Sequence, residues 1–246
     1  MKTTKIEWTE ATWNPSIGCS KVTAGCKNCY AEVMAKRLQA MGISCYEDGF
    51  KFKTLPERLT QPINIKKPTK FFVNSMSDLF HKSMPFDFLD KIFEVIENTP
   101  QHNYQILTKR ENTLQKYFLN RTVPKNVWLG VTVENEHTKN RIDVLRNISA
   151  AIRFISLEPL ISDVGKLNLK GIHWVIVGGE SGVRARPMSP EWVINIKNQC
   201  DKQNIAFFFK QWGTWGEDGV KRNKKENGSF LLGKQWKEEP IFYSTI

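Results

Sequence analysis

The sequence lacks any run of about 18 consecutive apolar residues, the length that a membrane-spanning helix requires. Residues 1–14 mix Lys, Glu, Thr and Trp and lack the apolar stretch of a secretory signal, so none is expected. No internal repeat or low-complexity segment interrupts the chain. These absences exclude a membrane-spanning helix and predict a cytoplasmic protein with no membrane partner.

Acidic residues are outnumbered by basic ones. The chain has 25 Asp and Glu against 36 Lys and Arg, which gives a formal net charge of +11. This charge favours anionic partners, nucleic acid first among them. It can also serve solubility alone, because a binding face needs its cations clustered. The composition therefore indicates a nucleic-acid or nucleotide partner without deciding it.

Cysteine is scarce, yet three of the five cysteines lie close together, at Cys19, Cys26 and Cys29. In a reducing compartment such crowding indicates a metal or cluster site more readily than disulfides. Three thiolates can hold three irons of a four-iron cluster and leave the fourth iron open for a ligand. Structural zinc usually takes four protein ligands, and no His lies near the triplet. The pattern favours an iron–sulfur cluster; zinc completed by Cys45 or a distant His, and unligated thiols, stay as alternatives.

Short β-branched and aromatic runs alternate with helical patterns. The runs cover residues 70–73, 104–107, 127–133, 152–157, 174–177 and 206–209, and a weaker one covers 11–17. Most are continuous apolar stretches, which is typical of a parallel sheet covered on both faces. Apolar residues at helical spacing follow most runs, for example between residues 89 and 96. An earlier helix is expected to begin near Tyr30 and to turn Met34, Leu38 and Met41 toward the core.

This strand–loop–helix pattern, repeated about six times, predicts an α/β fold with a single partial parallel (β/α) barrel of about six or seven strands. The length of 246 residues, 40% of them hydrophobic, is sufficient for one such core. We expect residues 1–213 to form the barrel domain. Residues 214–246 are expected to form a C-terminal extension packed on or beside it.

Polar side chains follow each apolar run. In a parallel barrel these strand ends converge on the face where the active site lies. The cysteine loop occupies the matching place after the first weak strand and leads into a helix, whose N-terminus favours thiolates. The sequence therefore predicts a polar site at this face with the cysteines at its edge.

Several segments resemble the three-cysteine-motif phage protein family, whose activity is largely uncharacterised. The matching segments are IEWT at 6–9, WNP at 13–15, GC at 18–19, GCKNCYAE at 25–32, FVNSMSDLF at 72–80, LTKR at 107–110, WLGVTVE at 128–134, WVIVGGESG at 174–182 and FKQWG at 209–213. They extend almost from end to end of the chain. The resemblance implies a protein of a bacterial or phage-infected host cell.

That family is in turn similar to the radical S-adenosylmethionine (SAM) superfamily, nearest to its spore-photoproduct-lyase-like members. The likeness rests on the cysteine loop, on Thr108-Lys109 after the third strand and on Arg141-Ile142 after the fourth. It implies a radical-SAM-like barrel, a [4Fe–4S] cluster held by Cys19, Cys26 and Cys29, and SAM bound at the open iron. In such enzymes electron transfer cleaves SAM to methionine and a 5′-deoxyadenosyl radical. Six residues separate the first two cysteines here, giving a CxxxxxxCxxC loop.

The resemblance also implies contacts to SAM. Seven residues after the predicted strands are the candidates: Ser75, Ser77, Asp78, Lys109, Thr132, Glu134 and Arg141. Asp78, with one of the two serines, is expected to accept hydrogen bonds from the amino group of SAM. Lys109 and Arg141 are expected to pair with its carboxylate, and Thr132 and Glu134 to take the ribose hydroxyls. Helix capping or ion pairing within the protein is the alternative for each.

Later strand ends carry the candidates for contact with a substrate. The candidate catalytic residues are His81, Glu180 and Lys210, and Glu158 and Gln211 are further candidate contacts. Two tryptophans are candidates for stacking on a base: Trp212 and Trp215. Gly178 and Gly179 are expected to let the backbone approach a ligand closely.

The leading hypothesis is an iron–sulfur radical SAM-type enzyme that reductively cleaves SAM and acts on nucleic acid or a nucleotide derivative. It implies an electron donor and allows a partner protein. The rival hypothesis is a zinc-stabilised nucleic-acid-binding or phage accessory protein without catalysis, in which the thiols support the structure and the positive charge binds the partner.

Overall fold

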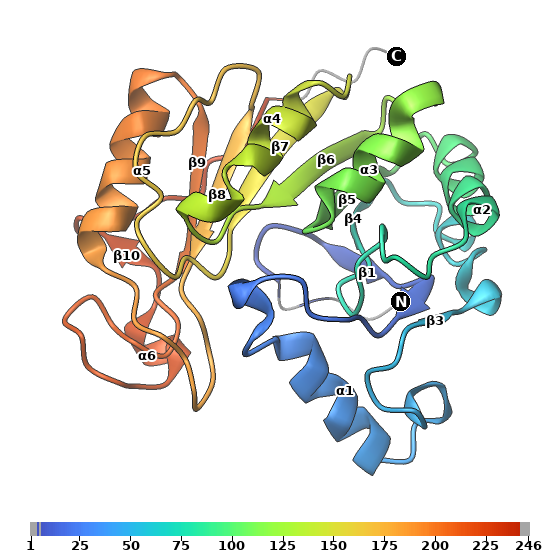
Figure 1. Cartoon of the computed structure of the whole chain (residues 1–246), viewed down its shortest axis with the longest axis horizontal. Helices are drawn as coiled ribbons and strands as arrows, with labels where there is room; N and C mark the ends of the chain where they lie inside the picture. Colours follow the sequence, from blue (N-terminus) through green and yellow to red (C-terminus); the bar gives the residue numbers. More distant parts are fainter. Residues whose placement is uncertain (1–3, 5, 242–246) are drawn as a thin grey trace. The chain divides into compact units, whose positions relative to one another are not determined.

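The computed structural model describes residue 4 and residues 6–241. Seven strands form one sheet in the order β1-β4-β5-β6-β7-β8-β9 (Figure 1). The chain divides into two compact units: unit 1 is Met1–Leu129 with Ile148–Ala151, and unit 2 is Gly130–Asn147 with Ile152–Ile246. The division falls within β6 (Val127–Thr132), whose six residues are all buried. The predicted α/β fold, a partial barrel sheet of about six or seven strands, is confirmed, whereas the predicted domain boundary near residue 213 stays a prediction.

Unit 1 is built on three parallel strands. β4 (Lys70–Val73) pairs with β1 (Ala11–Trp13) on one side and with β5 (Asn103–Thr108) on the other. Its helices are α1 (Tyr30–Ala40), α2 (Phe86–Glu97) and α3 (Glu111–Tyr117), with 3₁₀ turns at Ala24–Cys26, Ser44–Tyr46, Pro56–Arg58, Pro62–Asn64 and Phe118–Asn120. The predicted apolar stripe between residues 89 and 96 is the buried face of α2.

The weak run predicted at residues 11–17 is two strands rather than one. After β1 the chain leaves the sheet, and β2 (Ser16–Ile17) pairs antiparallel with β3 (Lys53–Thr54). Pro15 lies between β1 and β2 and has no N–H to continue the ladder, while its carbonyl accepts a hydrogen bond from the Leu55 N–H. This switch brings Gly18, at the start of the cysteine loop, beside Ser77 in the loop after β4.

The expected core face of α1 was wrong in part. Met34 and Met41 are 39% and 66% exposed, whereas Ala31 and Ala35 are buried. Ala35 packs in a small apolar cluster with Ile17, Tyr46 and Leu55, and Leu38 packs against that cluster. The buried stripe of α1 is therefore formed by Ala31, Ala35 and Leu38, which lie on one face of the helix.

Unit 2 continues with parallel strands. β8 (Trp174–Gly178) pairs with β7 (Ile152–Leu157) and with β9 (Ala206–Gln211). Its other elements are the 3₁₀ turn Glu136–Thr138, α4 (Asn140–Arg146), α5 (Pro190–Lys202), α6 (Lys224–Asn227), β10 (Phe230–Leu231) and β11 (Lys234–Gln235). None of the helices in the described part of the chain is long and apolar enough to cross a membrane.

Residues 236–238 pair with the last strand of unit 2. The Phe209 N–H donates to the Trp236 carbonyl over 2.9 Å, and the Glu238 N–H donates to the Phe207 carbonyl over 3.2 Å. These bonds occupy backbone groups of β9, which otherwise would present an open sheet edge.

Candidate functional site

The cysteine loop of unit 1 is fixed to the protein at its first turn. Gly18 has a positive φ of +72°, and a Cβ there would lie 2.1 Å from the Lys51 carbonyl oxygen. Only glycine fits this position. The Gly18 N–H donates to the Met76 carbonyl over 3.0 Å, and the Cys19 N–H donates to the Phe50 carbonyl over 3.1 Å. The loop then leads into α1, of which Cys29 is the N-cap.

The three cysteines of the loop line one cavity. Cys19, Cys26 and Cys29 border a volume of about 190 Å³ together with Ser20, Lys21, Glu32 and Phe50. All three thiols are free and partly exposed. Within the described residues, no three or more His, Cys, Asp or Glu side chains form a ready-made site for a single metal ion. The three sulfurs thus border one cavity but do not form a preformed metal site.

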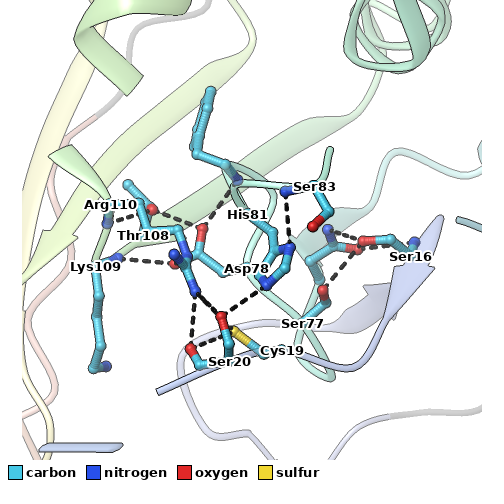
Figure 2. Close-up of polar contacts among 12 residues, drawn as sticks. Ser16, Cys19, Ser20, Ser77, Asp78, His81, Ser83, Thr108, Lys109 and Arg110 are labelled. Carbon is cyan, nitrogen blue, oxygen red and sulfur yellow. Dashed lines mark hydrogen bonds and ion pairs between the residues drawn. The ribbon is translucent and has the colours of Figure 1, made fainter. Parts of the chain in front are cut away.

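Asp78 ties the end of β4 to the end of β5 (Figure 2). One oxygen of its buried carboxylate accepts hydrogen bonds from the Phe80 N–H over 3.0 Å and from the Thr108 hydroxyl over 2.7 Å. The other accepts from the Lys109 N–H over 3.1 Å and lies 3.9 Å from Arg110 Nε. The Lys109 side chain runs away from Asp78 (Figure 2). The expected roles of Asp78 and Lys109 toward SAM stay predictions.

Ser75 and Ser77 hold the loop after β4 against the segment that carries the cysteines. The Ser75 hydroxyl donates to Asn14 Oδ1 over 3.2 Å, and the Ser77 hydroxyl donates to the Gly18 carbonyl over 2.6 Å. Asn74 supports the same junction: its side chain donates to Ser16 Oγ over 2.8 Å. The structure thus gathers Ser75, Ser77 and Asp78 in one loop, and their expected contacts to an amino group stay a prediction.

The sequence reasoning missed Arg110 and Ser20. Arg110 Nη2 lies 2.8 Å from the Ser20 carbonyl, 2.9 Å from Ser20 Oγ and 3.8 Å from Cys19 Sγ, and donates to all three (Figure 2). Ser20 Oγ also lies 3.0 Å from His81 Nε2. Arg110 directly follows Thr108-Lys109, on which the resemblance to the radical SAM superfamily rests. Its position in the same strand-end segment could have identified it as a candidate site residue.

His81 is held neutral in this cluster. Burial, and secondarily the charge of Arg110, lowers the pKa of its imidazole from 6.5 to about 4. The Ser83 N–H donates to His81 Nδ1 over 3.1 Å, so the ring proton is on Nε2. Phe52 stacks on the ring with centroids 4.3 Å apart. The same environment acts on the nearest thiol: burial, and then the charge of Asp78, raises the pKa of Cys19, while Arg110 opposes the rise.

The pKa of His81 predicts loss of stability in mild acid. Between pH 6.5 and about 4 the unfolded chain binds a proton at this residue that the folded chain does not. The free energy of unfolding should therefore fall as the pH is lowered through this window, by at most about 1.4 kcal/mol per pH unit from this group. Urea unfolding of the wild type and of His81→Asn, at about pH 7 and about pH 5, measures the difference. Asn retains an acceptor for the Ser83 N–H but does not titrate, so an equal pH dependence of the two proteins contradicts the prediction.

Three predicted cofactor residues meet in unit 2. The Glu134 carboxylate and the Arg141 guanidinium form a buried ion pair of 2.9 Å, in which the side chains are 0% and 3% exposed. Arg141 Nη1 also donates to the Thr132 carbonyl over 2.7 Å. Buried pairs of this kind hold both partners in fixed positions, since separating them leaves a charge in a poorly solvated place. Their expected contacts to SAM stay predictions.

Two further ion pairs occupy strand ends of unit 2. Lys210 Nζ lies 2.8 Å from Glu158 Oε1, and Arg186 Nη2 lies 2.7 Å from Glu180 Oε1. Arg186 was not identified from the sequence. Glu180 and Lys210 are therefore each ion-paired within the protein, and their catalytic roles, with that of His81 in unit 1, stay predictions. Gln211 donates to Ser181 Oγ over 3.0 Å.

The expectation that Trp212 stacks on a base was wrong. Trp212 is 2% exposed, its indole N–H donates to the Phe230 carbonyl over 2.8 Å, and its ring packs against Phe209, so it presents no face to a base. The Gly179 backbone comes close to other backbone, since a Cβ there would lie 1.8 Å from the Trp212 carbonyl oxygen, and its expected approach to a ligand stays a prediction. The glycine is required because the chain after β8 touches the chain after β9. Trp215 donates its indole N–H to the Ala185 carbonyl over 2.7 Å.

Several solved structures of spore photoproduct lyase are similar to the chain. The lyase complexed with dinucleoside spore photoproduct has 11% sequence identity and a TM-score of 0.43, over 82% of this chain and 63% of that chain. A mutant with bound AdoMet and dinucleoside spore photoproduct has 13% identity and a TM-score of 0.47, over the same shares. Another mutant has 14% identity and a TM-score of 0.45, over 90% of this chain and 71% of that chain. The chain thus spans 63% of the length of the first two structures.

No curated protein sequence is significantly similar to the chain. One protein family matches it over nearly all of its length, from residue 3 to residue 240. The chain belongs to this family, which is described as "Protein of unknown function (DUF5131)".

Proposed function

We propose that the protein is an iron–sulfur enzyme of the radical SAM type, working in the reducing cytoplasm of a bacterial or phage-infected cell. The observation that carries the proposal is the convergence of Cys19, Cys26 and Cys29 on one cavity. The sequence likeness at the cysteine loop and at Thr108-Lys109 supports it. Nucleic acid or a nucleotide derivative is the substrate class that the net charge of +11 favours.

The donor set fits a four-iron cluster. Each of the three thiolates would ligate one iron, which leaves one iron for another ligand. All three thiols are free for this role, and they border the same space of about 190 Å³. Cys29 is the N-cap residue of α1, beside the backbone N–H groups of the first helical turn.

Side chains of each unit position charged groups that the proposed reaction could use. With the cluster and SAM bound, the cofactors supply an electron and a carbon-centred radical able to remove a hydrogen atom from a substrate. In unit 1, Asp78 fixes the backbone of Lys109 and positions Arg110 beside the cysteine loop. In unit 2, the pairs Glu134–Arg141 and Glu158–Lys210 hold charged groups at strand ends. An electron donor is required by this reaction, and a partner protein is a further proposal.

The zinc alternative finds less support. It needs a fourth ligand, and Cys45 packs against the cluster of Ile17, Ala35, Tyr46 and Leu55 instead of lining the cavity. Its sulfur accepts a hydrogen bond of 3.4 Å from Arg58 Nη2. A noncatalytic nucleic-acid-binding protein would keep the same charge but would have no use for an open iron.

The metal that the wild-type protein binds tests the proposal. After anaerobic purification or reconstitution we expect about four irons and about four sulfides per chain. The reduced protein is then expected to convert SAM to 5′-deoxyadenosine, measured by liquid chromatography. Stoichiometric zinc with no iron uptake would favour the zinc alternative. Iron uptake without SAM cleavage would retain the cluster and refute the radical SAM reaction.

A further inference from the structure

Ser20 has a hydroxyl whose two acceptor sites are both used. Arg110 Nη2 donates to Ser20 Oγ over 2.9 Å. His81 Nε2 lies 3.0 Å from the same oxygen, and it must be a donor because the Ser83 N–H occupies Nδ1 of that ring. A serine hydroxyl has two acceptor lone pairs and one proton to donate. With both lone pairs taken, the remaining function of Ser20 Oγ is to donate its proton.

The surroundings of Ser20 direct that proton toward the cysteine cavity. Ser20 borders the cavity together with Cys19, Cys26 and Cys29. In the part of the chain that the structure describes, the Ser20 hydroxyl has contacts to Arg110 and His81, and both of these are donors to it. Figure 2 shows Ser20 beside Cys19, with Arg110 and His81 on its other sides. The hydroxyl proton is therefore available to an acceptor in the cavity.

We propose that Ser20, held by Arg110 and His81, donates a hydrogen bond to the iron–sulfur cluster and thereby raises the cluster's reduction potential; this rests on the proposed function. Reduction adds negative charge to the sulfurs of a cluster, and a hydrogen bond to sulfur stabilises the more negative state. Arg110 acts in the same direction, because its guanidinium lies 3.8 Å from Cys19 Sγ. Ser20 is on this account a positioning and tuning residue and not a ligand.

The two side chains that hold the Ser20 hydroxyl are themselves fixed in position, so the hydroxyl is preorganised as a donor. Arg110 is anchored by Asp78, whose carboxylate is fixed by the Thr108 hydroxyl and the Lys109 N–H. His81 is fixed by the Ser83 N–H and by stacking on Phe52. A preorganised hydrogen bond costs little reorganisation when charge develops on the acceptor.

The test compares the reconstituted wild type with Ser20→Ala, Ser20→Thr and Ser83→Ala. Ser83→Ala is a matched control, because it removes an exposed serine hydroxyl and keeps the backbone N–H that orients His81. A redox titration followed by electron paramagnetic resonance measures the midpoint potential. We expect Ser20→Ala to make reduction about tenfold less favourable, which lowers the potential of a one-electron couple by about 59 mV. Ser20→Thr and Ser83→Ala should stay near the wild type.

A second readout separates donation from a structural effect. The exchangeable proton of Ser20 should couple to the reduced cluster in an electron–nuclear double resonance spectrum, in the wild type and in Ser20→Thr but not in Ser20→Ala. An unchanged potential in Ser20→Ala, or the same proton signal in all variants, overturns the proposal. Loss of iron from Ser20→Ala also overturns it, because a tuning donor is not needed to hold the metal. A wild type that binds no cluster refutes the proposed function itself, which is a distinguishable result.

Discussion

Replacing Cys26 with serine is expected to abolish cluster binding. One iron then loses its thiolate, and the remaining two cysteines cannot hold a four-iron cluster stably, so the iron content should fall from about four per chain to nearly none. Cys26 ends the 3₁₀ turn Ala24–Cys26, and its N–H donates to the Thr23 carbonyl over 2.9 Å. The substitution leaves this backbone bond intact, so the protein should stay folded. Iron and sulfide analysis with the visible absorption spectrum measures the loss.

Cys45→Ser is the matched control for this variant. Cys45 is a free, partly exposed cysteine like Cys26, but it contacts Arg58 and an apolar cluster and does not border the cavity. It should therefore keep the full iron content and the wild-type spectrum. If both variants lose metal equally, Cys45 is a ligand and the zinc alternative gains the support that it now lacks. If Cys26→Ser keeps its iron, the three-thiolate site is wrong.

Replacing Gly179 with alanine is expected to lower the free energy of unfolding by about 3 kcal/mol. The added Cβ would lie 1.8 Å from the Trp212 carbonyl oxygen, which belongs to backbone and cannot rotate away. The Gly179 N–H donates to the Gln211 carbonyl over 2.9 Å, so separating the two segments also costs a hydrogen bond. Denaturant unfolding measures the effect.

The neighbouring glycine provides the control. At Gly178 the nearest atom to an added Cβ is Glu158 Oε1, at 3.0 Å, which belongs to a side chain paired with Lys210 and not to backbone. A shift of a few tenths of an ångström in that side chain should limit the loss in Gly178→Ala to about 1 kcal/mol. Equal losses in the two variants would show that the contact with Trp212 does not decide the requirement for glycine. A loss of ligand binding in Gly179→Ala without a loss of stability would support the expectation that the backbone at Gly179 approaches a ligand.

Asp78 lies after a strand, as expected, and it also makes contacts within the protein that the sequence did not indicate. The sequence placed it after a strand, as a carboxylate facing an amino group. The structure gives it hydrogen bonds from Phe80, Thr108 and Lys109 and an ion pair with Arg110. Asp78 therefore also organises the segment 108–110, which reaches the cysteine loop. This role depends on the ends of β4 and β5 lying side by side, so the sequence alone did not indicate it.

The amino-acid sequence by itself indicated most of the parallel strands, several of the helices and the cysteine triplet. The continuous apolar run 174–177 reports burial directly, because a strand covered on both faces carries mostly apolar side chains. The spacing of Cys26 and Cys29 is similarly local, since both lie within one turn and the start of one helix. Local patterns of this kind need no knowledge of distant residues.

Only the tertiary structure decided which side chains surround the site. Arg110 and Cys19 are 91 residues apart, and Ser20 and His81 are 61 apart. No periodicity connects such residues, because their contact depends on the parallel pairing of β4 with β5 and on the turn at Gly18. Likewise, Ala35 and not Met34 lies on the buried face of α1, because Ala35 packs in the apolar cluster with Ile17, Tyr46 and Leu55. Burial periodicity follows from local chain geometry, whereas hydrogen bonds and close packing require the distances that folding alone sets.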